Sequence, residues 1–100
     1  MEQKIIRLLA QKVSIKDDEL QEYEFTASDL MKNENAAGKE FYKEIDNASD
    51  LLMKRSIKVR NSDTKEWRRY HWVDSAEFNE GMLKFRIHND LKPFYVSLKS

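Results

Sequence analysis

The sequence predicts an α+β domain, with helices in the first half of the chain and antiparallel strands in the second. Apolar residues follow helical spacing up to about residue 54, and from Ser56 onward they alternate with polar residues. Turn-forming residues separate the alternating segments. The chain has 100 residues, enough for one domain with one core.

The first helix is predicted from Glu2 to about Lys16, because its apolar residues recur on one face. The acidic segment that follows, as far as Glu22, has no apolar periodicity and is expected to be a loop. Tyr23 and Phe25 then alternate with polar neighbours, which predicts a short half-buried strand. A short second helix is predicted through residue 31.

Thr26 or Ser28 is expected to cap this second helix, with Asp29 favourably placed in its first turn. Small polar residues at 33–38 predict a turn. The longest helical pattern follows, over residues 39–54, where one apolar stripe is formed by Phe41, Ile45, Ala48 and Leu52.

The polar side of this long helix mixes bases with acids, among them Glu40, Glu44 and Asp46. A helix that reads bases in a DNA groove faces phosphates, which disfavour so many carboxylates. We therefore interpret this side as ordinary solvated surface.

Three strands are predicted in the second half, over residues 56–60, 67–73 and 83–87, and we expect them to form one three-stranded antiparallel sheet. Turn residues lie at 61–64 and 79–81. A short C-terminal helix is predicted over residues 89–98, with Pro93 near its start. Two helices joined by a turn and followed by hairpins give a winged helix-turn-helix plan, in which the helices pack on the sheet.

The composition indicates a cytoplasmic protein that is not embedded in a membrane. No cysteine is present, and no apolar run approaches the ~18 residues of a membrane span. The net charge is zero, yet residues 17–34 carry −6 and residues 51–72 carry +5. One face of the molecule is therefore expected to be basic.

The basic segment suggests contacts to DNA phosphates. Long cations near strand ends and turns can reach the DNA backbone without reading bases. The alternative is that some of them only keep an edge strand soluble. The candidates are Lys54, Arg55, Lys58, Arg60, Lys65, Arg68 and Arg69.

Trp67 and Tyr70 lie among these cations and are candidates for a dimer interface, since exposed aromatic residues mark partner surfaces. Stacking on single-stranded bases is a second possibility, which we rank lower. The two histidines, His71 and His88, would approach each other only if their strands were neighbours, and no further ligands are spaced to complete a metal site. No cofactor motif or catalytic nucleophile is recognisable, so we expect a binding protein and not an enzyme.

Several segments, taken in order, resemble a known family. These are the helix at 2–9, the junction Leu-Leu-Met-Lys-Arg-Ser-Ile-Lys-Val at 51–59, Trp67, the stretch at 72–78, and Leu-Lys-Pro-Phe-Tyr-Val-Ser-Leu at 91–98. The sequence is similar over nearly its whole length to the amino-terminal winged-helix domain of plasmid replication initiator (Rep) proteins, with residues 1–100 as one such domain. Members of the family continue into a second winged helix, which these 100 residues do not contain.

The resemblance implies a protein that binds repeated sequences (iterons) of a plasmid origin as double-stranded DNA, and that recruits host replication proteins and chaperones. It also implies a homodimer that represses and a monomer that initiates. The amino-terminal domain would then supply dimerisation and supporting DNA contacts. Two other readings stay open: a winged-helix transcriptional regulator, and a pure dimerisation or protein-interaction module.

Overall fold

The computed structural model describes residues 1–18, 21–31 and 39–98. Four α-helices lie at Glu2–Lys12 (α1), Ala27–Met31 (α2), Lys39–Lys54 (α3) and Lys92–Ser97 (α4), and the 3-10 helix η1 spans Asn89–Leu91. The strands are Tyr23–Thr26 (β1), Ser56–Arg60 (β2), Trp67–His71 (β3), Ser75–Asn79 (β4) and Met82–Arg86 (β5). The α+β class and the short C-terminal helix are confirmed.

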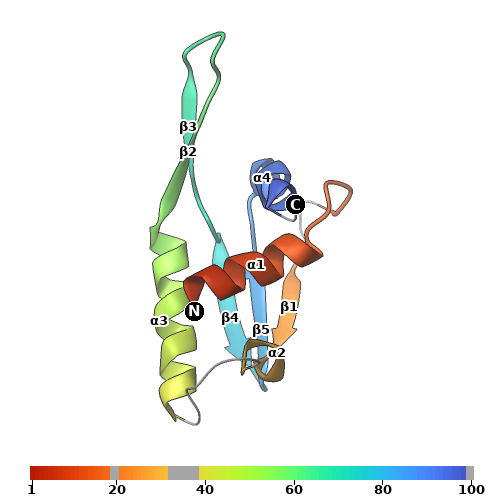
Figure 1. Cartoon of the computed structure of the whole chain (residues 1–100), viewed down its shortest axis with the longest axis vertical. Coiled ribbons are helices and arrows are strands. Elements are labelled where there is room, and N and C mark those ends of the chain that lie inside the picture. The colour runs from red at the N-terminus through yellow and green to blue at the C-terminus, as the bar shows by residue number, and fades with distance from the viewer. Residues whose placement is uncertain (19–20, 32–38, 99–100) are drawn as a thin grey trace.

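The strands form two separate antiparallel sheets. One has the order β1-β5-β4, and the other is the hairpin β2-β3, which projects away from the rest of the chain (Figure 1). The projection makes the molecule long and narrow, with extents of 49 × 25 × 24 Å. A three-stranded sheet is present as expected, but β2 and β3 are not part of it; β1 and the unpredicted strand β4 flank β5 instead.

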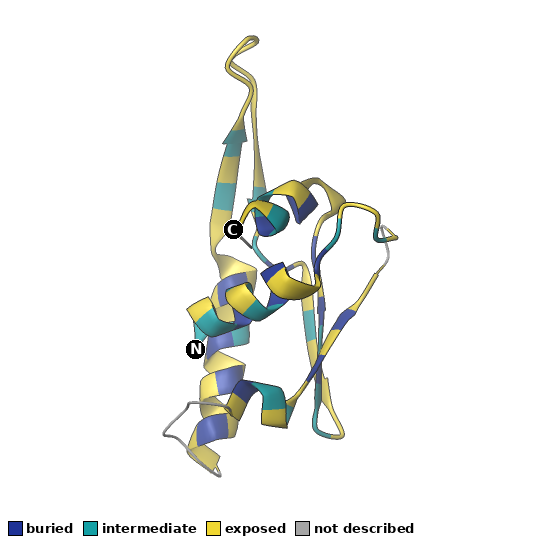
Figure 2. Cartoon of the chain, turned by 45° about the vertical axis from the view of Figure 1, so that its right-hand side comes forward, coloured by how far each residue is buried: buried dark blue, intermediate teal, exposed yellow. Residues whose placement is uncertain are grey.

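The core lies between the three-stranded sheet and the helices. Tyr23 and Phe25 of β1 face inward beside Leu83 and Phe85 of β5, as the alternation predicted. The long helix α3 has the predicted bounds and buries the predicted stripe of Phe41, Ile45, Ala48 and Leu52. Helix α1 crosses the domain in contact with both α3 and α4 (Figure 2).

Helix α1 ends earlier than predicted. Val13 has an extended backbone (φ −70°, ψ 135°), and the backbone N–H of Ser14 donates to Asp17 Oδ2 at 2.8 Å. That local bond replaces a continuing helical bond, so residues 13–16 begin the acidic loop. Buried Lys92 then fixes the loop by donating from Nζ to the carbonyl oxygens of Asp17 and Asp18, at 2.6 and 2.9 Å.

Helix α2 begins with a reciprocal cap. Thr26 Oγ1 accepts from the Asp29 N–H, and Asp29 Oδ2 accepts from the Thr26 N–H, both at 3.1 Å. This confirms Thr26, of the two candidates, as the capping residue. The turn predicted at 33–38 lies outside the described residues.

Candidate nucleic-acid interface

The β2-β3 hairpin with its turn, residues 56–71, carries five of the seven basic candidates, and we call it the basic hairpin. Its tip is ordered by Asn61, whose Oδ1 accepts from the backbone of Asp63 at 3.0 Å and of Thr64 at 3.4 Å. Lys65 adopts a left-handed backbone (φ 64°), and its N–H donates to the Asn61 carbonyl oxygen. These bonds close the turn predicted from residues 61–64.

The strand register separates the hairpin into two faces. Residues directly opposite each other in an antiparallel pair share a face. Lys58 lies opposite Arg69, and Arg60 opposite Trp67. We call these four residues the Trp67 face. Ile57 and Val59 lie on the other face, opposite Tyr70 and Arg68.

Positive charges crowd the Trp67 face. Lys58 Nζ lies 4.5 Å from the centre of the Trp67 ring system, and the Arg69 guanidinium carbon lies 5.1 Å from it. Such cation–π contacts hold the side chains together, but Lys58 and Arg69 still repel each other. The pKa of Lys58 is lowered from its ordinary value, first by desolvation and then by the charges of Arg60 and Arg69. An anion at this face would relieve the repulsion.

The opposite face is tied to the body through one carboxylate, that of Asp90 in η1. Its Oδ2 accepts from the Tyr70 hydroxyl at 2.6 Å and lies 3.9 Å from Arg68 Nη1. This hydrogen bond is the largest cause of the raised pKa of Tyr70, followed by desolvation. The Tyr70 ring also stacks on His88 at 4.7 Å, and His88 Nδ1 accepts from the Asp90 N–H. Tyr70, Arg68, His88 and Asp90 form what we call the hairpin junction.

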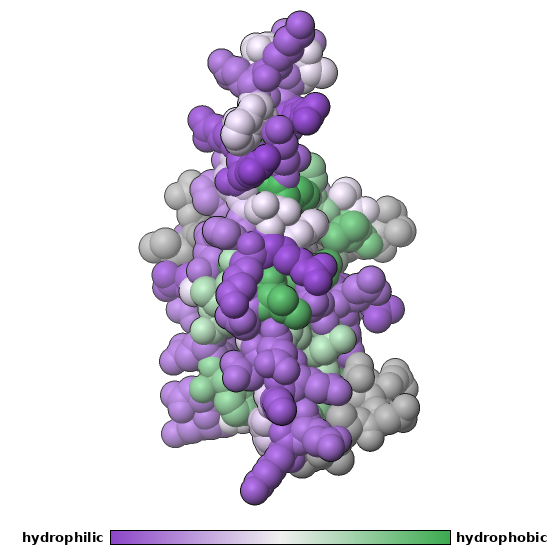
Figure 3. Space-filling model, turned by 90° about the vertical axis from the view of Figure 1, so that its left-hand side faces the viewer, coloured by the Kyte–Doolittle hydropathy of each residue, from purple (hydrophilic) through white to green (hydrophobic). Residues whose placement is uncertain are grey.

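Carboxylates divide the seven basic candidates into two groups. Lys54 pairs with Asp50 at 2.9 Å, Arg55 with Glu2 at 3.1 Å, and Arg68 with Asp90. Among the described residues, no carboxylate forms an ion pair with the other four, Lys58, Arg60, Lys65 and Arg69. All four lie on the basic hairpin, which appears as a mostly hydrophilic projection in Figure 3.

The aromatic candidates have different surroundings. The Trp67 side chain is 53% exposed, whereas Tyr70 is half-buried in the hairpin junction. Sequence reasoning did not place Asp90 or His88 beside Tyr70, because they lie about twenty residues further along the chain and no local pattern signals that pairing. The strand of His71 does not pair with the segment that holds His88. The His71 side chain lies on the face of β3 that points away from Tyr70, whereas it is Tyr70 that contacts His88.

The polar side of α3 is exposed, including Glu40, Glu44 and Asp46. Within the described ranges, no helix is long and apolar enough to cross a membrane. The same residues hold no group of three or more side chains suited to a metal ion.

The crystal structure of the WH1 domain of MSBI1.176, a replication protein isolated from a multiple sclerosis patient, is similar to this fold. The TM-score is 0.70 at 17% sequence identity, over 98% of this chain and 78% of that one. The likeness shows a winged-helix fold, as predicted. No curated protein matches the chain. The family model described as "Initiator Replication protein, WH1" matches residues 1–100 in full, and the chain therefore belongs to this family of replication initiators.

Proposed function

We propose that the domain supports plasmid replication initiation by holding the phosphate backbone of double-stranded origin DNA with its basic hairpin. The observation that carries the proposal is the set of four cations, Lys58, Arg60, Lys65 and Arg69, for which the described residues provide no carboxylate partner. Membership of the initiator family supports DNA as the anion.

The shape of the hairpin suits this role. A two-stranded ribbon is narrow enough to enter a major groove or lie along its edge. Lysine and arginine contacts to phosphates position a protein without reading sequence. The choice of repeated origin sequences therefore has to come from contacts outside this hairpin, and the domain would strengthen recognition performed elsewhere.

The test compares two double variants that remove the same charge. Lys58→Ala with Arg69→Ala removes two unpaired cations, whereas Lys54→Ala with Arg55→Ala removes two that are paired with acids. We expect the first to weaken binding to any duplex and to flatten the dependence of log affinity on log salt by up to ~2 units. Fluorescence anisotropy at several ionic strengths measures both quantities.

The second double variant is the matched control and should bind almost as the unmodified chain does. Equal losses in the two variants would mean that net charge alone matters. Absence of duplex binding even at low salt would contradict the proposal that this domain holds DNA.

Self-association through the basic hairpin is a second candidate, favoured by the 53% exposure of Trp67. A dimer of this kind would bury the indole between two copies, a typical position for an interface anchor. We expect Trp67→Ala to weaken the dimer in sedimentation equilibrium while the monomer stays folded. A chain that stays monomeric at high concentration, with or without Trp67, would contradict this candidate.

We further infer that the domain acts by binding and not by catalysis. The sequence has no glycine-rich phosphate loop and no nucleophile–base pair with motif support. Recruitment of host replication proteins and chaperones, and action as a transcriptional regulator, would both use binding surfaces of this kind.

A further inference from the structure

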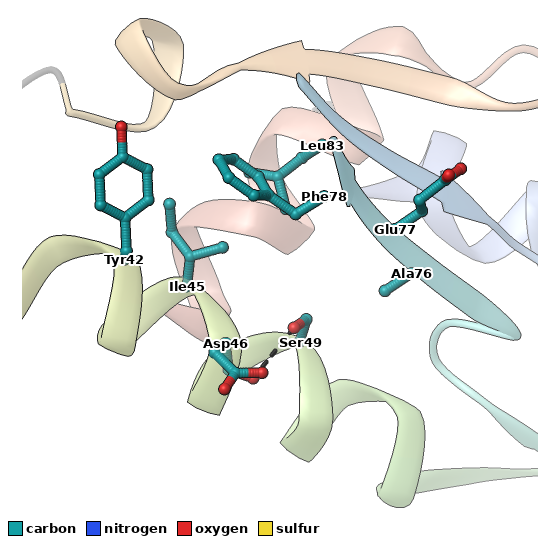
Figure 4. Close-up of a pocket in the computed structure, with 8 residues that line it drawn as sticks. All are labelled: Tyr42, Ile45, Asp46, Ser49, Ala76, Glu77, Phe78 and Leu83. Atoms are coloured by element: carbon teal, nitrogen blue, oxygen red, sulfur yellow. Dashed lines mark hydrogen bonds between the residues drawn. The ribbon is translucent and has the colours of Figure 1, made fainter. Parts of the chain in front are cut away.

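A groove lies between α3 and the face of the sheet formed by β4 and β5. Its cavity measures about 330 Å³, near the lower end of the range for ligand-binding pockets. Helix α3 contributes Tyr42, Ile45, Asp46 and Ser49, and the sheet contributes residues 76–78 and Leu83 (Figure 4). The elements that line it, α3, β4 and β5, belong to the body of the domain, from which the basic hairpin projects (Figure 1).

Two aromatic side chains line the groove and make it apolar, and both remain partly exposed to solvent. Tyr42 and Phe78 stack edge to face, with ring centres 5.5 Å apart. Tyr42 is nevertheless 49% exposed and Phe78 45% exposed. Pairs of large aromatic residues left half in water are characteristic of partner surfaces.

The strand beside the groove has a free edge. In the order β1-β5-β4, the far side of β4 faces no other strand among the described residues. Glu80 and Gly81 have φ of 52° and 77°, which makes the β4-β5 connection a two-residue turn of type I′. Hydrogen-bonded pairs then alternate back from the turn, so Ala76 and Phe78 direct their backbone N–H and C=O outward from the free edge, beside the groove that their side chains line.

The charges around the groove indicate which kind of partner segment would bind there. Asp46 is the only charged side chain that α3 contributes to the lining, whereas Glu77 of β4 lies opposite Lys84 and points away from α3 (Figure 4). Asp74 and Glu80 stand just beyond the two ends of β4, and the segment 74–80 contains no base. A segment with lysine or arginine on either side of an apolar anchor therefore complements this region, whereas an acidic one would be repelled.

We propose that this groove binds an extended, cationic segment of a partner protein, which adds as a strand to the edge of β4. Its backbone would bond to Ala76 and Phe78, an apolar side chain would pack against Tyr42 and Phe78, and its flanking cations would lie near Asp46. Strand addition next to a helix is an established mode of peptide recognition. The proposal does not depend on DNA binding by the basic hairpin.

The experiment uses the purified chain and a fluorescein-labelled peptide, Lys-Arg-Val-Leu-Val-Arg-Lys. We expect saturable binding by anisotropy that weakens as salt is added. The same peptide with its three central amides N-methylated should fail to bind, because it cannot complete a strand ladder. A version with glutamate in place of every cation should also fail.

Two charge reversals on α3 test the location. Asp46→Lys should weaken peptide binding by roughly tenfold, since like charges across an interface cost more than ~1.4 kcal/mol. Glu44→Lys changes the charge equally but lies on the far side of the helix, and it should leave the affinity unchanged. Amide exchange at Ala76 and Phe78 should slow when the peptide is present, a readout that requires no variant.

Several results would overturn the proposal. Unchanged binding of the N-methylated peptide would show docking without strand addition. Equal effects of the two charge reversals would show attraction by net charge only. A dimer in sedimentation that Phe78→Ser dissociates would assign the groove to a second copy of the chain.

Discussion

The body of the domain and the basic hairpin are stabilised in different ways. Within residues 1–18, 21–31 and 39–98, every buried apolar side chain lies in the helices, the three-stranded sheet and their connections, and neither β2 nor β3 contributes one. The hairpin is held by its strand pairing, by the Trp72 N–H bond to the Arg55 carbonyl oxygen, and by the junction at Asp90. Substitutions in the body should therefore change stability, and those in the hairpin should change binding.

The largest effect is expected for Phe85→Ala. Phe85 is fully buried in β5, with its ring centre 6.1 Å from that of Phe25. Removing a buried aromatic ring costs roughly 3–5 kcal/mol, because the cavity closes only in part. Chemical denaturation measures this loss. Trp67→Ala, in the hairpin, should cost less than about 1 kcal/mol. Similar losses of unfolding free energy in the two variants would contradict the difference in stabilisation between the body and the hairpin.

A second effect concerns Lys92, a buried cation that has no counterpart in the hairpin. Lys92→Met keeps the length of the side chain but leaves two loop carbonyl oxygens without their donor. We expect a loss of roughly 1–3 kcal/mol in the free energy of unfolding. Lys84→Met is the control, since Lys84 is partly exposed and lies 3.8 Å from Glu24. An unchanged free energy of unfolding in Lys92→Met would mean that water takes the place of the ammonium group as donor to these carbonyl oxygens.

The smallest effect on global stability is expected at the hairpin junction. Tyr70→Phe removes the hydroxyl that donates to Asp90 and keeps the ring that stacks on His88. We expect amide exchange in β2 and β3 to accelerate severalfold, because one tether to the body is lost. Exchange in β5 should stay the same. Faster exchange in both sheets would show that hairpin and body unfold together.

The sequence predicted those elements whose stabilising contacts are local in the chain. Helix α3 was predicted with its bounds, because a stripe of four buried residues recurs over sixteen positions. Strand β4 was missed, since Ser-Ala-Glu-Phe-Asn is weakly apolar and acquires its conformation by pairing with β5. The separation of β2-β3 from the main sheet is likewise a tertiary effect that alternation does not encode.

In the candidate site too, the sequence did not reveal contacts between segments that lie far apart in the chain. Sequence alone located the basic segment, but it could not tell which cations were neutralised. Arg55 meets Glu2 of α1, and Arg68 meets Asp90 of η1. Only folding brings these acids close. The structure was therefore needed to reduce the seven candidates to the four that pair with no carboxylate among the described residues.

If the basic hairpin holds DNA as we propose, the hairpin junction would also set a balance between the rates of association and dissociation. Asp90 anchors a long arm near its base, so a small rotation there displaces the cations at the tip by a much larger distance. A loosely anchored arm sweeps more volume and encounters a phosphate sooner. A tightly anchored arm loses less conformational entropy when it binds and stays bound longer. In a DNA complex of this kind, one carboxylate would thus adjust the balance between capture and retention without adding or removing a positive charge.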